Sequence, residues 1–179
     1  GGSEDIHKPG VKVVKNLSDN RCKGDLYVVN PKMEEVQGTK SYRAAEDLPN
    51  VDLAILANAA KFCPQTVEVV AKQKNTKAVI TLSAGFHEES EEGAKLEQQI
   101  VDTINSVGGS LIGPNCVGMM NTNYVGVFIE PIPHFDPMGV DFITASGATA
   151  VFILESAITT GLQFNSVYSV GNSAQIGVE

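Results

Sequence analysis

Residues 51–83 read VDLAILANAAKFCPQTVEVVAKQKNTKAVITLS, and this stretch decides the fold class. Its two ends, residues 51–58 and 77–83, are short runs that are mostly apolar, as in strands that are buried on both faces. Between them, residues 64–75 begin with a proline and are amphipathic with the period of a helix. A strand, a helix and a second strand in this order predict a βαβ unit with parallel strands.

The same alternation of strands and helices extends in both directions along the chain. Toward the N-terminus, the sequence predicts a helix over residues 9–20, a buried strand over 25–30 and a short helix over 43–48. Toward the C-terminus, it predicts a helix over residues 89–109, whose first turns are rich in acidic residues, and a strand over 110–113. We therefore expect an α/β fold with a doubly wound parallel sheet, whose ligands bind beyond the carboxyl ends of the strands.

A second unit is predicted near the C-terminus of the chain. Residues 131–139 are rich in proline, and we interpret them as a connection between domains. The sequence then predicts one further βαβ unit, with its strand, helix and strand over residues 140–145, 148–161 and 164–170. The expected organisation is a first domain over residues 1–136, lacking its first strand, and a truncated second domain over residues 137–179.

The composition excludes several classes of function. The formal net charge of −8 argues against wholesale binding to nucleic acid or to an anionic membrane, because no basic excess is available to neutralise phosphates. The three cysteines, Cys22, Cys63 and Cys116, form no CxxC pair, which favours reduced thiols in the cytoplasm over a disulfide framework or a zinc site. We therefore expect no structural metal, and no apolar run is long enough to span a bilayer.

Small and polar residues follow each of four predicted strands. Because the carboxyl ends of parallel strands meet at one edge of the sheet, these residues are the candidates for a ligand site. They are Asn30 to Lys32, Asn58 to Lys61, Ser83 to Phe86 and Pro114 to Cys116.

Two of the loops suggest which kind of ligand binds. The run GGSEDIHKPG at residues 1–10 offers glycines, Ser3 and Lys8 before a helix, which suits a phosphate, although it is not GxGxxG. Pro31 and Lys32 follow the strand at which an NAD site would place an acidic residue, so a ribose that carries a phosphate is favoured. NADP and coenzyme A both satisfy this requirement, but none of the three histidines stands in a catalytic motif that would support hydride transfer.

Five motifs also follow one another in the order typical of a known family: GGS with KPG, YVVNPK, VDLAIL with AAKFCP, SAGFHE, and GPNCVGMMN. On these motifs the chain resembles the CoA-binding domain of NDP-forming acyl-CoA synthetases, which include the ADP-forming acetate–CoA ligases and the succinyl-CoA synthetase alpha subunit. Residues 144–157, TASGATAVFILESA, are similar to the start of that family's next, flavodoxin-like domain.

The resemblance implies a set of site residues. Those implied near the coenzyme A phosphates are Gly2, Ser3, Lys8 and Gly10, and those near the ribose phosphate are Pro31 and Lys32. Those implied along the pantetheine arm are Ala59, Ala60, Ser83, Ala84 and Gly85, and those near its thiol end are Asn115 and Cys116. The resemblance further implies a phosphate site at Ser146 and Gly147. Cys116 is expected to line the site and not to act as a nucleophile, because the family uses the thiol of coenzyme A.

The resemblance also implies a function for the parent protein. Such ligases join a carboxylic acid to coenzyme A through an acyl phosphate and a phosphohistidine, with an ATP-grasp beta subunit or domain that handles ATP, ADP and Mg. The phosphohistidine would lie beyond residue 179, so this chain alone is expected to bind coenzyme A without turnover. A homo-oligomer is compatible with the resemblance. The alternatives are a stand-alone regulatory module that binds coenzyme A and an NADP-binding oxidoreductase domain.

Overall fold

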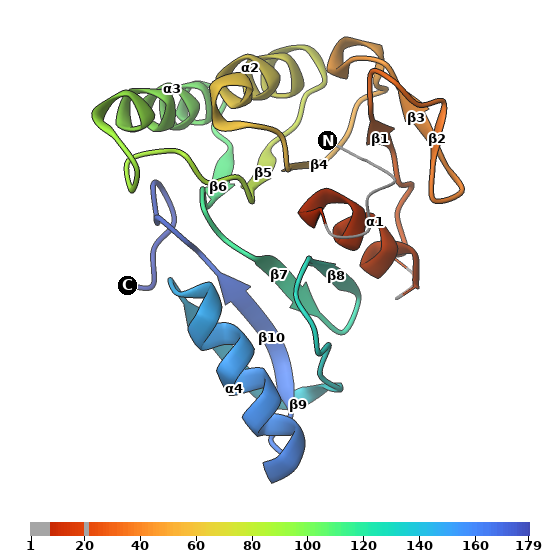
Figure 1. Ribbon diagram of the computed structural model, residues 1–179, viewed down its shortest axis with the longest axis vertical. Coiled ribbons are helices and arrows are strands. Elements are labelled where there is room, and N and C mark those ends of the chain that lie inside the picture. The colour runs from red at the N-terminus through yellow and green to blue at the C-terminus, as the bar shows by residue number, and fades with distance from the viewer. Residues whose placement is uncertain (1–7, 20–21) are drawn as a thin grey trace.

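The computed structural model describes residues 8–19 and 22–179, and it has an upper and a lower unit in the view of Figure 1. The upper unit is built on the strands β4 (Leu53–Leu56), β5 (Ala78–Thr81) and β6 (Ser110–Ile112). They pair in the order β4-β5-β6 and all run parallel. The predicted α/β fold with a parallel sheet is therefore confirmed.

Helices cover this sheet on both faces. The helices α2 (Cys63–Gln73) and α3 (Glu91–Ser106) lie side by side over the upper face in Figure 1, and α1 (Pro9–Asp19) lies on the opposite side. Because both faces are covered, the strands are apolar on both sides, which explains the unbroken apolar runs in the sequence. The core under α2 and α3 contains Val67, Val79, Ile100, Ile104 and Leu111, and the core under α1 contains Val13, Leu17, Ile80 and Leu82.

A small sheet lies between α1 and β4 in the chain. The strands β1 (Val28–Val29), β2 (Glu35–Val36) and β3 (Thr39–Tyr42) pair in the order β1-β3-β2. A tight turn at Gln37 and Gly38, both with positive φ, joins β2 to β3. The sequence did not predict this hairpin, whereas the predicted short helix is present as a 3₁₀ turn.

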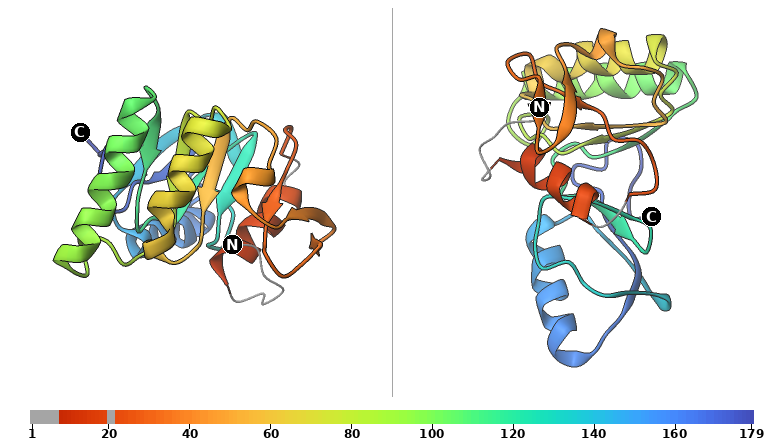
Figure 2. Two further views of the ribbon diagram at one scale, coloured as in Figure 1. Left: turned by 90° about the horizontal axis from the view of Figure 1, so that it is seen from above. Right: turned by 90° about the vertical axis from the view of Figure 1, so that its right-hand side faces the viewer.

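The lower unit contains a mixed sheet with the strand order β8-β7-β10-β9. The strand β9 (Phe135–Thr144), the helix α4 (Gly147–Thr160) and the parallel strand β10 (Phe164–Ser169) form the predicted βαβ unit. The strands β7 (Gly118–Asn121) and β8 (Tyr124–Val127) form a hairpin that the sequence did not predict, and β7 pairs antiparallel with β10. The right-hand view of Figure 2 shows α4 beneath the upper unit, at the opposite end from α2 and α3.

The segment predicted to connect two domains, residues 131–139, overlaps β9, which begins at Phe135, so its second half is a strand and not a loop. Pro137 lies inside β9, and it is tolerated there because β9 is an edge strand with a neighbour on one side only. The domain division at residue 136 stays a prediction, and β7 and β8 share a sheet with β10 across it. Among the described residues, no helix is both long and apolar enough to cross a membrane.

Candidate functional site

A cavity of about 620 Å³ lies where the two units meet. It opens at the ends of β4 and β5, at the turn after β6 and at the start of α4, which is the edge of the sheet where a doubly wound fold binds its ligands. Its lining consists of Pro9, Ala57, Asn58, Ala59, Leu82, Ser83, Ala84, Asn115, Cys116, Val117, Phe128, Ala145, Ser146 and Gly147.

Polar contacts around Asn58 hold the loop after β4 in place. The hydroxyl of Ser83 donates to the Asn58 carbonyl, which ties together the loops that follow the neighbouring strands β4 and β5. The Asn58 amide nitrogen donates to Thr66 Oγ1 at 3.2 Å, and Cys63 Sγ donates to Asn58 Oδ1 at 3.3 Å. Burial raises the pKa of Cys63 to about 11, so the thiol stays protonated and available as this donor at neutral pH. The sequence did not reveal this role of Cys63.

The turn after β6 is defined by a close approach of two backbones. Gly113 has a φ of +95°, and a Cβ atom there would lie 2.4 Å from the carbonyl oxygen of Thr81, so only glycine fits. The thiol of Cys116 donates to the same carbonyl at 3.4 Å. Burial raises the pKa of Cys116 to about 12, and only 3% of the residue is exposed. Its thiol is therefore a neutral packing group rather than a thiolate.

The start of α4 faces this turn across the cavity. Ser146 is the residue before the first helical turn, and its hydroxyl accepts a hydrogen bond from the backbone N–H of Thr149 at 3.2 Å. The first turn of α4 carries no acidic residue. The positive end of the helix dipole therefore faces the cavity without a carboxylate in that turn to neutralise it, although the N–H groups of Ser146 and Thr149 are already bonded within the chain.

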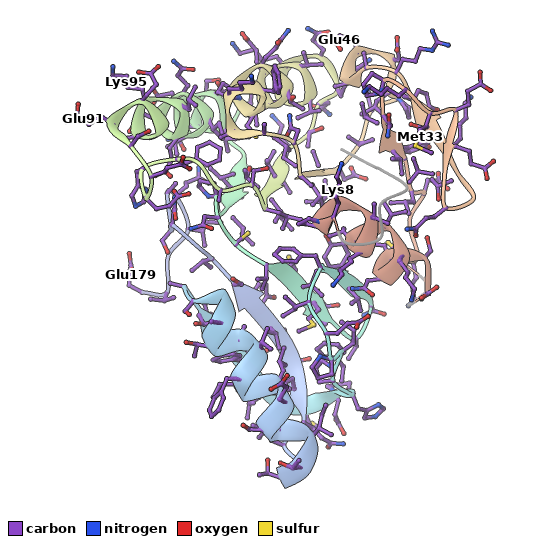
Figure 3. The ribbon with its side chains drawn as sticks, in the orientation of Figure 1. Lys8, Met33, Glu46, Glu91, Lys95 and Glu179 are labelled. Carbon is purple, nitrogen blue, oxygen red and sulfur yellow. The ribbon has the colours of Figure 1, made fainter. Side chains whose placement is uncertain are left out.

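The chemistry of the lining is neutral. Among the described residues that line the cavity, none has an acidic, lysine or arginine side chain, and Ala57, Ala59, Ala84 and Ala145 contribute only small side chains to its walls. Lys8 is exposed beside Pro9 at the start of α1, as Figure 3 shows. Within the described part of the chain, no group of three or more His, Cys, Asp or Glu side chains could hold a metal ion. The described lining thus offers small apolar groups and a few neutral polar groups.

The structure brings together one part of the predicted site. Seven of the predicted residues line the cavity: Ala59, Ser83, Ala84, Asn115, Cys116, Ser146 and Gly147. Ala60 and Gly85 are not among the lining residues but lie against each other, since a Cβ atom at Gly85 would be 3.2 Å from that of Ala60. Pro9, Phe128 and Ala145 line the cavity although the sequence did not single them out.

The other predicted residues lie elsewhere. Gly10 is buried within α1, next to the lining residue Pro9. Pro31 and Lys32 are exposed after β1, where Asn30 Oδ1 accepts from the Lys32 backbone N–H at 2.8 Å and turns the chain. The predictions for Gly2 and Ser3 fall outside the described residues.

Comparisons with known proteins identify the family of the chain. The family described as CoA binding domain matches residues 1–122. The chain is 39% identical to an ADP-forming acetate–CoA ligase II subunit alpha from Pyrococcus furiosus, over 98% of this chain and 38% of that protein. The chain therefore spans about two fifths of the length of this relative.

Solved structures show the same fold. A crystal structure from Pyrococcus horikoshii OT3 has a TM-score of 0.90 and 38% identity, with 99% of this chain and 41% of that chain covered. The dinucleotide-forming acetyl-coenzyme A synthetase 1 of Ca. Korarchaeum cryptofilum, in complex with phosphate and ADP, has a TM-score of 0.89 and 26% identity, with 99% of this chain and 38% of that chain covered.

Proposed function

The chain belongs to the family of CoA-binding domains found in ADP-forming acyl-CoA synthetases, and from this premise we propose that it forms the coenzyme A site of an acid–thiol ligase. The ligase would join a carboxylic acid to coenzyme A while ATP and ADP are interconverted. The observation that carries the proposal is the neutral cavity between the strand ends and the start of α4.

The cavity suits the pantetheine arm of coenzyme A. This arm is uncharged, flexible and carries amide groups, so it requires small walls with a few hydrogen-bonding groups rather than ionic partners. Ala59 and Ala84 supply the small walls, and Ser83 and Asn115 supply the polar groups. The thiol of the coenzyme would then lie near Asn115 and Cys116. This thiol, and not that of Cys116, would attack the acyl group.

The phosphates of coenzyme A would lie outside the cavity. Lys8 precedes α1 near the cavity mouth, and Lys32 follows β1 with its ammonium group in solvent. A lysine can meet a phosphate as a point charge without a preformed pocket. We assign Lys32 to the 3′-phosphate of the ribose, which NADP lacks at that position.

The start of α4 would hold a phosphoryl group. An acyl phosphate and a phosphohistidine are the expected intermediates of such a ligase, and either would place a phosphate at the first turn of α4, which begins at Gly147. The Ser146 backbone N–H donates to Thr144 Oγ1 at 3.1 Å, so Ser146 would take part through its hydroxyl. The name of the alpha-subunit relative supports a beta subunit as a partner for this chain. The resemblance of the sequence implies that this partner, or a further domain, is an ATP-grasp unit that would handle ATP and Mg.

Calorimetric titration of the chain with coenzyme A and, separately, with NADP tests the proposal. We expect saturable heat with coenzyme A and none with NADP, because only coenzyme A has a pantetheine arm to fill the cavity. Heat with NADP and none with coenzyme A would overturn the proposal and support a dinucleotide-dependent oxidoreductase.

A further inference from the structure

The segment that follows β10 returns to the upper unit and packs along the turn after β6 (Figure 1). The backbone N–H of Asn172 donates to the Pro114 carbonyl at 2.9 Å, and that of Ala174 donates to the Gly113 carbonyl at 3.2 Å. Gly171 allows this approach, because it has a φ of +55° and a Cβ atom there would lie 2.2 Å from the Pro114 oxygen. We call residues 171–175 the returning segment.

The side chain of Asn172 is fully engaged, and its orientation is determined by charge. Its amide nitrogen donates to Glu97 Oε2 at 2.9 Å and to Glu88 Oε2 at 2.5 Å. Turning the amide over would direct its oxygen at two carboxylates, which is unfavourable. The Asn172 oxygen is therefore the group that faces Asn115, and it accepts from Asn115 Nδ2 at 3.3 Å.

The two carboxylates are themselves held in place. Glu97 is a largely buried residue of α3, and its other oxygen contacts His87 Nδ1 at 2.6 Å. Glu88 accepts from the backbone N–H of Gly85 at 2.7 Å. Although partial burial opposes the shift, hydrogen bonds from Asn172 and from the backbone lower the pKa of Glu88. This carboxylate thus stays ionised and keeps the Asn172 amide fixed.

Asn115 is the other end of this chain of contacts. It lines the cavity in a left-handed conformation, with a φ of +54°. Its backbone N–H donates to the Ser83 carbonyl at 2.9 Å. This bond holds the main chain of Asn115 but does not by itself fix the rotation of its side chain. The contact with Asn172 restricts that rotation, because it commits the Asn115 amide nitrogen to the returning segment.

We propose that Asn172 is a positioning residue for the thiol end of the coenzyme site, and that it acts by orienting the side chain of Asn115. This inference rests on the proposed function, because it concerns the site assigned there to coenzyme A. It makes the returning segment part of the site even though none of residues 171–175 lines the cavity.

The first test is spectroscopic and needs no ligand. In a ¹⁵N-labelled chain, the Asn172→Ala substitution should shift the side-chain amide resonances of Asn115. The matched control is Asn165→Ala, because Asn165 also donates its amide to a carboxylate, Asp141, at 3.0 Å, but lies on β10 outside the cavity lining. Unchanged Asn115 resonances in Asn172→Ala would overturn the inference.

The second test compares ligands. By calorimetry, Asn172→Ala should weaken coenzyme A binding by about threefold to tenfold, the range for one hydrogen bond. It should leave unchanged the affinity for adenosine 3′,5′-bisphosphate, which has no pantetheine arm. In an Asn115→Ala background, Asn172→Ala should have no further effect on coenzyme A. Equal losses for both ligands, or additive losses in the double variant, would contradict a positioning role.

Two further variants keep the inference testable if Asn172→Ala does not fold. If Asn172→Ala fails to fold, Asn172→Ser gives the same expectation with a smaller perturbation of the returning segment. Asn172→Asp keeps an oxygen that could accept from Asn115, but it loses the donors to Glu88 and Glu97 and adds a third carboxylate beside them, so the side chain is no longer held toward Asn115 and affinity should not be restored. If the unsubstituted chain binds neither ligand, the proposed function fails and this inference fails with it. If it binds coenzyme A and the Asn172 variants bind equally well, only this inference fails.

Discussion

The thiol of Cys116 donates a hydrogen bond to the backbone carbonyl of Thr81, with a sulfur–oxygen distance of 3.4 Å. This contact ties the turn after β6 to the end of β5, the central strand of the upper sheet. The same carbonyl lies against Gly113, so the turn contacts this one backbone group of β5 at two residues, Gly113 and Cys116. Cys116 therefore shapes the cavity wall by packing, and its chemistry as a thiol is secondary.

This role predicts how stability changes at alkaline pH. Burial raises the pKa of Cys116 from 9.0 to about 12, so the fold favours the neutral thiol. The stability that the neutral thiol gives to the fold is fully present below pH 9.0. It is lost as the pH rises toward about 12, because the unfolded chain gives up the thiol proton at a lower pH than the folded chain does. Urea denaturation should show that Cys116→Ala reduces the alkaline loss of unfolding free energy by up to about 1.4 kcal/mol per pH unit. The control Cys22→Ala changes a thiol that is only partly buried. If the free energy of unfolding fell with alkaline pH at the same rate in the unsubstituted chain, Cys116→Ala and Cys22→Ala, this role would be contradicted.

Replacing Gly113 should be more damaging than replacing any ordinary surface glycine. Gly113→Ala places a Cβ atom 2.4 Å from the Thr81 oxygen at a φ of +95°. We expect a loss of roughly 3 kcal/mol in the free energy of unfolding, measured by urea denaturation. Gly24→Ala is the matched control, because a Cβ atom there meets nothing within 4 Å. A loss of equal size in the two variants would show that the turn is not constrained.

The sequence could predict much of the upper unit because its signals are local. The apolar runs that became β4, β5 and β6 alternate with amphipathic segments, and both patterns follow from burial on two faces. The edge strand β9 was harder, because Pro137 normally argues against a strand and only the position at the edge makes it acceptable. The strand β2 has only two residues, too few for a periodic pattern, and β7 (GMMN) begins with glycine and ends with asparagine, so it lacks the unbroken apolar run of β4 and β5.

The candidate site was predictable to the extent that strand ends define it. Ser83, Ala84 and Asn115 follow predicted strands and line one cavity. Asn172 could not be found in this way, because its importance depends on contacts with Glu88 and Glu97, which are 84 and 75 positions away in the sequence. Lys32 illustrates a different limit, since it is exposed after β1 and is not among the residues that line the cavity, so its role stays a prediction.

The cap of α4 yields a further prediction. Ser146→Ala removes the side-chain acceptor for the Thr149 N–H, which should cost about 1 kcal/mol of unfolding free energy. It should also weaken binding of inorganic phosphate, because the first turn would lose its fixed geometry. Ser156→Ala is the control, since Ser156 lies in the middle of α4 and donates to the Phe152 carbonyl. Equal phosphate affinity in all three proteins would argue against an anion site at this helix start.

Lys32 provides a prediction about the adenosine end of the ligand. Lys32→Ala should weaken coenzyme A by roughly fivefold to tenfold, but it should hardly affect dephospho-coenzyme A, which lacks the 3′-phosphate. Calorimetry with both ligands measures the difference. Lys95→Ala is a suitable control, because this exposed lysine lies on α3, well away from Met33, the neighbour of Lys32, in Figure 3. Equal losses for the two ligands in Lys32→Ala would reject the assignment.

The central claim is that the cavity holds the pantetheine arm, and filling the cavity tests it most directly. Ala84 is exposed and lines the cavity, so Ala84→Trp should block the space without disturbing the core. Titration should show that the affinity for coenzyme A falls at least about tenfold, whereas that for adenosine 3′,5′-bisphosphate is unchanged. Coenzyme A binding to Ala84→Trp as tight as to the unsubstituted chain would contradict the claim.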